Sequence, residues 1–226
     1  MSFPSIRIEG SILSGELLAR LDSADFPGQR HGDFGFDSAV RLKDDILRAW
    51  THAQNAWRMH NDRLEAPRAS KSGITETRNF IEGLFGLLGY AELEYDAQAE
   101  MVGDKPFRFT HRLRSHSGFP VHIVGARESL DRKPEGSGPR VSPHAHVQEY
   151  LNLTEHLYAL VTNGRLLRLL RDSTRLVKLS YVEFDLDRIF GEELFADFAV
   201  LYRLLHVSRL PRSPESAADS LLESYH

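Results

Sequence analysis

The chain has 226 residues, contains no cysteine and carries a formal net charge of −4. The length suffices for one large domain, and the missing cysteine excludes disulfide frameworks, thiolate zinc sites and cysteine nucleophiles. No apolar run approaches the roughly 18 residues of a membrane span, and no signal peptide is visible, so we expect a cytoplasmic protein without a membrane partner. The negative net charge by itself argues against a nucleic-acid binder.

The first third of the chain predicts a strand and two helices. Weak alternation of apolar residues over 1–13 favours one strand. Ser14 can cap a short helix that extends to Leu21. Apolar residues then recur at three- and four-residue steps from Asp37, which predicts a long helix limited by Pro67.

A second apolar helix is predicted over residues 74–90, with Thr75 as its N-cap and Gly89 as its left-handed stop. A β-rich region follows this helix. Its strands are predicted near residues 93–95, 107–113 and 121–124.

The later part of the chain predicts a helix, a hairpin and a final helix. Ser142 and Pro143 occupy the N-cap and first position of a helix that runs to about Thr154. Asn163-Gly164 then predicts a tight β-hairpin. The remaining elements are predicted as a buried strand before this turn, strands at 165–171 and 176–184, and one helix over 186–207.

This order of elements predicts an α/β (α+β) fold in which helices flank a mixed β-sheet. We expect a strand and helical extension over residues 1–69, an α/β core over 70–210, and a linker over 211–226. The last segment starts a helix without a stop signal, so we expect it to lead into a further domain.

Motifs for common chemistries are missing. The chain contains no Gly-rich phosphate loop, no G-x-S-x-G elbow and no H-E-x-x-H. His144 and His146 would point about 200° apart on a helix, so they are not expected to bind a metal together. Asp185 and Asp187 are expected to cap a helix rather than to bind a metal. The residues therefore predict neither a metal site nor a catalytic group.

The charges are unevenly distributed along the chain. Residues 105–140 carry a net charge of +5 and residues 163–178 carry +4, so the remainder carries −13. Such segregation favours a basic face that attracts a phosphate backbone through counterion release. The alternative is a set of arginines paired with nearby acids.

Several phrases of the chain resemble a known protein family. They are EYLN at 149–152, LVTNGRLLRLLRD at 160–172, YVEFDLDRIF at 181–190, FADFAVLYRLLHVSR at 195–209, GARESLDR at 125–132 and ITETRNFIEGLFGLLGY at 74–90. Over roughly residues 70–226 the chain is similar to the N-terminal region of large restriction–modification and defence-island DNA adenine methyltransferases, including single-chain type IIG enzymes. The resemblance implies a restriction-endonuclease-like, PD-(D/E)XK core and a downstream methyltransferase domain that uses S-adenosylmethionine.

The resemblance also implies that the nuclease site is degenerate. Active members carry an acid-x-Lys triplet where this chain has Gly125, Ala126 and Arg127. Glycine cannot bind Mg²⁺, and arginine is a poor substitute for a water-positioning lysine. The preceding strand, FRFTHRLR, also lacks an acid, and the nearest one upstream is Asp104.

We therefore expect a non-catalytic, DNA-associated N-terminal module of a bacterial restriction–modification or phage-defence DNA methyltransferase. The residues expected to contact the DNA backbone are Arg108, Arg112, Arg114, Arg127, Arg165 and Arg168. No catalytic residue, metal ligand or cofactor is expected in this chain. The parent protein is expected to use S-adenosylmethionine.

Two alternatives remain open. In the first, the chain is an active Mg²⁺-dependent endonuclease with a displaced acid such as Asp104, Glu128 or Glu149. In the second, it is a scaffold that binds other subunits of a defence complex through the apolar helices predicted at 192–206 and 216–225.

Overall fold

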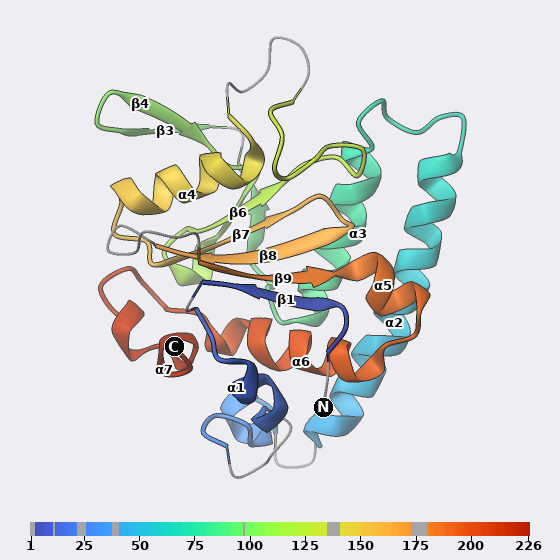
Figure 1. Cartoon of the computed structure of the whole chain (residues 1–226), viewed down its shortest axis with the longest axis vertical. Helices are drawn as coiled ribbons and strands as arrows, with labels where there is room; N and C mark the ends of the chain where they lie inside the picture. Colours follow the sequence, from blue (N-terminus) through green and yellow to red (C-terminus); the bar gives the residue numbers. More distant parts are fainter. Residues whose placement is uncertain are drawn as a thin grey trace.

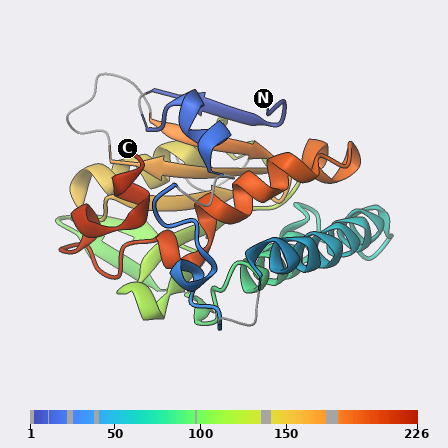
Figure 2. The ribbon, with the colours of Figure 1, turned by 90° about the horizontal axis from the view of Figure 1, so that it is seen from below.

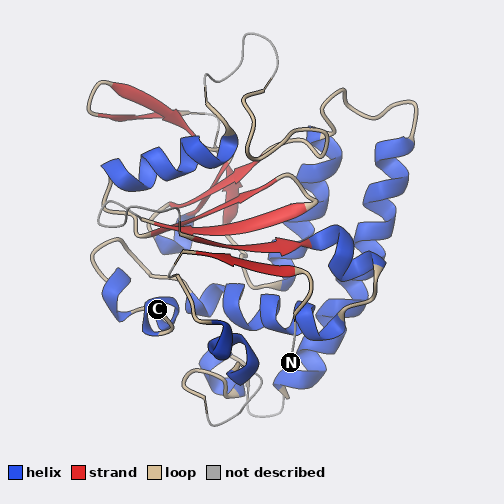
Figure 3. Cartoon of the chain, in the orientation of Figure 1, coloured by secondary structure: helices blue, strands red, loops and turns tan. Residues whose placement is uncertain are grey.

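A seven-stranded mixed β-sheet forms the centre of the protein (Figures 1 and 3). The computed structural model describes residues 3–10, 12–21, 26–37, 41–96, 98–134, 141–172 and 180–226. The sheet order is β1-β9-β8-β7-β6-β5-β2, and β3 and β4 form a separate hairpin. The strands are β1 (Ile6–Glu9), β2 (Leu93–Tyr95), β3 (Ala99–Val102), β4 (Lys105–Arg108), β5 (His111–Leu113), β6 (Phe119–Ile123), β7 (Tyr158–Thr162), β8 (Leu166–Arg171) and β9 (Tyr181–Asp185).

Helices cover both faces of the sheet, which confirms the predicted mixed sheet with flanking helices. Figure 2 shows α2, α3 and α6 on one side. The α-helices are α1 (Gly15–Arg20), α2 (Leu42–Glu65), α3 (Ile74–Leu87), α4 (Pro143–Leu153), α5 (Leu186–Gly191), α6 (Phe195–Leu205) and α7 (Leu221–Ser224). Short 3₁₀ helices lie at His31–Phe34, Arg114–His116, Val207–Arg209 and Ala217–Asp219.

The sheet contains one parallel pair, β6 and β7, and its other neighbouring strands are antiparallel. Helix α4 lies between β6 and β7 in the chain, as a parallel connection requires. The Asn163-Gly164 hairpin is confirmed between β7 and β8. Gly164 has a φ of 78°, and the Asn163 Oδ1 atom accepts hydrogen bonds from the N–H groups of Arg165 and Leu166.

Two apolar clusters lie on opposite faces of the sheet. The larger contains buried residues of α1, α2, α3 and α6 together with Leu167, Leu169 and Phe184 of the sheet. The smaller lies beneath α4 and joins Val147 and Leu151 of that helix to strand residues. Alternate residues of a strand face opposite sides, so each strand supplies both clusters.

Most predicted helix ends are confirmed, but three expectations are wrong. Helix α2 begins at Leu42, after Arg41 as its N-cap, and not at Asp37. Ser14 and Ser142 cap α1 and α4 through their side chains. Helix α3, however, begins after Gly73, which has a φ of 77°, so Thr75 lies inside the helix. The last predicted helix is divided into α5 and α6, because Glu193 adopts a left-handed φ of 56°.

The core extends across both predicted domain boundaries. Strand β1, from the predicted N-terminal extension, pairs with β9 at the edge of the main sheet. At the other end, Leu222 and Tyr225 are buried, and Arg171 pairs with Glu223 at 2.6 Å. Within the described residues, no helix is long and apolar enough to cross a membrane.

Candidate functional site

The single strand predicted over residues 107–113 is divided in the structure: β4 pairs with β3 in the separate hairpin, and only β5 lies beside β6. Strand β5 lies antiparallel to β6, with His111 opposite Val121. Residues 125–127, where the resemblance leads us to expect an acid-x-Lys triplet, follow β6 after Val124. Acids on these two strands would lie close enough together to bind one ion. Neither strand carries an acid, and Gly125 lies five residues along the chain from Pro120, the partner of Arg112.

Gly125 packs directly against the backbone of the loop between α2 and α3. An ideal Cβ atom at this position would lie 2.7 Å from the carbonyl carbon of Ser72, and closer still to its oxygen. Backbone atoms cannot rotate away as a side chain can, so a larger residue requires movement of one of the two loops. A carboxylate side chain therefore has no room at this position in the observed fold.

Arg127 ties the same segment to the end of α2. Its Nη1 atom donates to the carbonyl oxygens of Ser70 and Lys71 at 2.7 and 3.2 Å, and its Nη2 atom donates to that of Leu64. The backbone N–H of Arg127 also donates to the Ser72 carbonyl at 3.1 Å. An arginine can hold several carbonyl groups at once because its guanidinium carries five donors in a plane. Arg127 thus joins the sheet to the α2–α3 hairpin.

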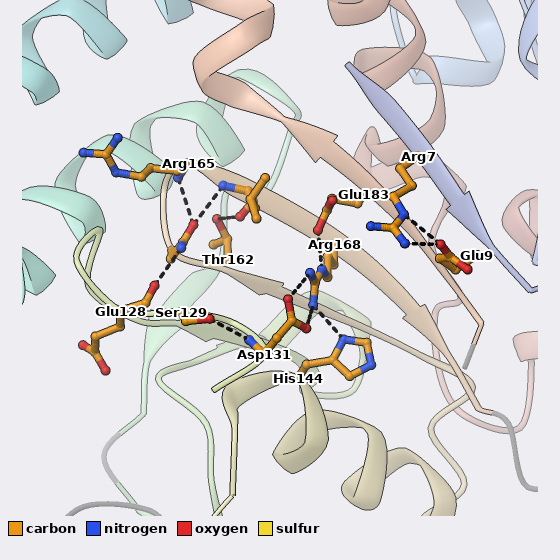
Figure 4. Close-up of polar contacts among 12 residues, drawn as sticks. Arg7, Glu9, Glu128, Ser129, Asp131, His144, Thr162, Arg165, Arg168 and Glu183 are labelled. Carbon is orange, nitrogen blue, oxygen red and sulfur yellow. Dashed lines mark hydrogen bonds and ion pairs between the residues drawn. The ribbon is translucent and has the colours of Figure 1, made fainter. Parts of the chain in front are cut away.

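Arg168 lies at the centre of a buried charge cluster on the α4 side of the sheet (Figure 4). Its side chain is 3% exposed and contacts Glu183 at 2.6 Å. It also binds both carboxylate oxygens of Asp131, at 2.6 and 2.8 Å. Burial opposes the charge, but the hydrogen bonds to the two carboxylates raise the pKa of Arg168 above its ordinary value. Both charged partners compensate the buried guanidinium.

His144, at the start of α4, completes this cluster. Its Nδ1 atom lies 3.1 Å from Nη1 of Arg168. Arginine can only donate, so Nδ1 accepts and the neutral ring carries its hydrogen on Nε2. Burial, with a further contribution from the Arg168 charge, lowers the pKa of His144 to about 4. The ring is therefore neutral at physiological pH and acts as an acceptor for Arg168.

The Arg112 side chain, like that of Arg168, is mostly covered and contacts other parts of the chain. Its guanidinium contacts Glu100 of the β3–β4 hairpin at 2.5 Å and donates to the Tyr150 hydroxyl at 3.1 Å. It also lies 4.6 Å from the centre of the Phe109 ring. With a side chain that is 15% exposed, Arg112 joins the hairpin, β5 and α4.

The other three predicted DNA-binding residues lie on the surface. Arg165 is 48% exposed, pairs with Asp187 at 2.9 Å and donates to the carbonyl of Ala126. Arg114 is 73% exposed and pairs with Glu94. The Arg108 side chain is exposed on β4.

The six arginines do not form one cluster. Arg127 and Arg165 approach one another through Ala126, whereas Arg114 lies at the opposite end of the strands. Glu94, Glu100, Glu183 and Asp187, which neutralise several of the arginines, all come from outside the two basic segments. Three cations of these segments, Arg140, Arg175 and Lys178, lie outside the described residues.

The acids proposed as displaced nuclease ligands do not converge. Glu149 pairs with Lys105 at 2.5 Å, and Glu128 accepts from the N–H of Gly125 at 3.1 Å. Asp104 lies exposed in the turn between β3 and β4. In the part of the chain that the structure describes, no three metal-ligating side chains come together.

The partners of Arg168 were not foreseen from the sequence. Asp131, His144 and Glu183 come from a loop, a helix and a neighbouring strand, and no spacing joins them. The one available signal is the position of Arg168 inside an otherwise apolar run, where it shares a strand face with Leu166 and Leu170, which indicates an arginine on a covered face. Asp185 does cap α5 as expected, while Asp187 pairs with Arg165.

Buried histidines predict that the protein loses stability in mild acid. Burial lowers the pKa of His144, His156 and His206 to about 4 and that of His122 to about 3. Below pH 6.5 these histidines bind more protons in the unfolded chain, where their pKa values are about 6.5, than in the folded protein. Stability is therefore full above pH 6.5 and falls by up to about 1.4 kcal/mol per pH unit for each histidine towards pH 4.

Urea unfolding at pH 7, 6 and 5 tests this dependence. A His144→Gln variant, which removes one titrating group, is expected to show a shallower decline than the wild type. Equal stability of the wild-type protein at pH 7 and pH 5 would contradict the prediction.

No protein-family model, no curated protein and no solved structure matches the chain.

Proposed function

We propose that the chain is a non-catalytic, DNA-associated module of a bacterial restriction–modification or phage-defence DNA methyltransferase. In this proposal it has a restriction-endonuclease-like core and works in the cytoplasm beside a methyltransferase domain that uses S-adenosylmethionine. The observation that carries the proposal is the position of Gly125, where the backbone of Ser72 fills the space that a metal-binding carboxylate would need. Arg127, in place of the lysine, is engaged with three backbone carbonyls.

Arg108, Arg114 and Arg165 support the DNA contact because their side chains are exposed. An exposed ion pair contributes only about 0–1 kcal/mol, so a DNA phosphate can replace Glu94 or Asp187 at little cost. Arg112, Arg127 and Arg168 contribute to packing instead, since their guanidinium groups hold other parts of the chain. The proposed contact therefore rests on the three exposed arginines.

A binding assay with a fluorescent duplex tests the proposal. We expect the dissociation constant to rise with salt, and an Arg108→Ala/Arg114→Ala/Arg165→Ala variant to bind about tenfold or more weakly with a smaller salt slope. Arg58→Ala is the matched control, since Arg58 is 55% exposed, lies 3.8 Å from Glu193 and belongs to neither basic segment. A dissociation constant that changes neither with salt nor in the triple variant would contradict the DNA contact.

The same preparations test the absence of catalysis. Plasmid DNA with Mg²⁺ or Mn²⁺ is expected to remain intact. Cleavage by the wild type that disappears in an Asp104→Ala/Glu128→Ala variant would instead support the endonuclease alternative. Separate readouts for binding and cleavage keep the two parts of the proposal distinguishable.

A further inference from the structure

Strand β1 forms one edge of the seven-stranded sheet. It pairs with β9 on one side, and among the described residues no strand pairs with its other side. In Figure 2, β1 lies at the upper margin of the sheet. An edge strand presents backbone donors and acceptors that can pair with another chain.

The hydrogen bonds between β1 and β9 determine which backbone groups of β1 are directed outward. The N–H of Asp185 donates to the carbonyl of Ser5 at 2.9 Å, so Ser5 faces β9. Backbone groups alternate in direction along a strand, hence Arg7 also faces β9 while Ile8 faces away from it. Both the N–H and the carbonyl of Ile8 are thus directed to the open edge.

The side chains of β1 are complementary to a second copy of the same strand. In an antiparallel pair centred on Ile8, the two Ile8 residues exchange two hydrogen bonds across a two-fold axis. Arg7 then lies opposite Glu9 of the second copy, and Glu9 opposite Arg7. Figure 4 shows Arg7 and Glu9 on one face of β1, where they pair within one chain. Opposite charges directly across two strands stabilise the pairing.

From this register we infer that the protein forms a symmetric dimer through β1, which joins two sheets into one. The apolar residues beside the edge favour the same arrangement. Phe3, Ile6 and Ile8 are only partly buried against the core, and Phe3 also lines an apolar cavity of about 400 Å³ between α1, α2 and α6. A second copy at this edge would shield them further from water.

The opposite edge of the sheet does not offer such a match. Strand β2 has three residues with Glu94 at its centre, so a two-fold pair there places two glutamates opposite each other. Like charges in this position are destabilising. Glu94 also already pairs with Arg114, the residue that follows β5. The complementary edge is therefore β1.

Sedimentation velocity over a concentration series tests the dimer. Arg7→Glu and Glu9→Arg each place like charges across the two-fold axis, and each is expected to raise the dimer dissociation constant about tenfold or more. An equimolar mixture of the two variants restores opposite charges and is expected to form the heterodimer. Formation of this heterodimer would show that each variant is still folded and that the single variants lost only charge complementarity.

Two further variants address the backbone register. Ile8→Pro removes the outward N–H and is expected to yield a folded monomer, since this group does not bond to β9. The chain contains no cysteine, so Ile8→Cys is expected to form a single intermolecular disulfide on mild oxidation. A wild-type protein that stays monomeric at high concentration overturns the inference. A dimer whose dissociation constant is the same in both charge variants as in the wild type also overturns the inference.

Discussion

Replacement of Arg168 by methionine is expected to lower the free energy of unfolding by about 3–5 kcal/mol. The guanidinium is 3% exposed, and the more buried of its two carboxylate partners, Glu183, is 11% exposed. Without Arg168 the Glu183 carboxylate remains largely buried without its charged partner, and desolvation of the charge is then uncompensated. Asp131 is 62% exposed, so water can solvate it after the substitution.

A double variant distinguishes this cause from a simple loss of packing. Arg168→Met/Glu183→Leu removes both members of the buried pair, which face each other across β8 and β9. Replacement of a buried ion pair by apolar residues is often close to neutral, so we expect the double variant to recover most of the loss. Urea denaturation of both variants measures the difference. If the double variant is no more stable than Arg168→Met alone, the buried carboxylate is not the source of the effect.

Substitution of Gly125 by alanine is expected to destabilise the protein by about 3 kcal/mol, at the upper end of ordinary overpacking costs. The added methyl group would collide with the backbone of Ser72, which also accepts the N–H of Arg127. The collision therefore separates the sheet from the loop between α2 and α3. Such a cost would explain why residue 125 does not accommodate a side chain larger than that of glycine.

Gly83→Ala is the matched control for this substitution. Gly83 lies on the exposed side of α3, and an added Cβ atom meets nothing within 4 Å. Alanine is expected to stabilise the helix by about 0.5–1 kcal/mol. Thermal unfolding of the two variants should therefore move in opposite directions. A Gly125→Ala protein as stable as the wild type would contradict the steric interpretation.

The sequence predicted local turns and helix caps correctly, but it did not predict contacts between residues that are distant in the chain. Local signals, such as the Ser142 cap and the Asn163-Gly164 turn, are confirmed because neighbouring residues decide them. The break at Glu193 was missed, because apolar residues continue at helical spacing on both sides of it. The expectation of a separate N-terminal extension did not foresee β1 in the sheet, since its partner β9 lies over 170 residues away in the chain.

The charge pattern shows why the site needed the tertiary structure. The sequence alone determined that cations concentrate in two segments and that Gly125, Ala126 and Arg127 stand where the resemblance would have an acid-x-Lys triplet. Only folding decided that Arg112 and Arg168 meet Glu100 and Glu183 from the acidic remainder. Charges distant in the sequence become neighbours because apolar burial dictates which strands and helices pack together. The net charge of −4 therefore reflects, in part, acids that neutralise the arginines in space.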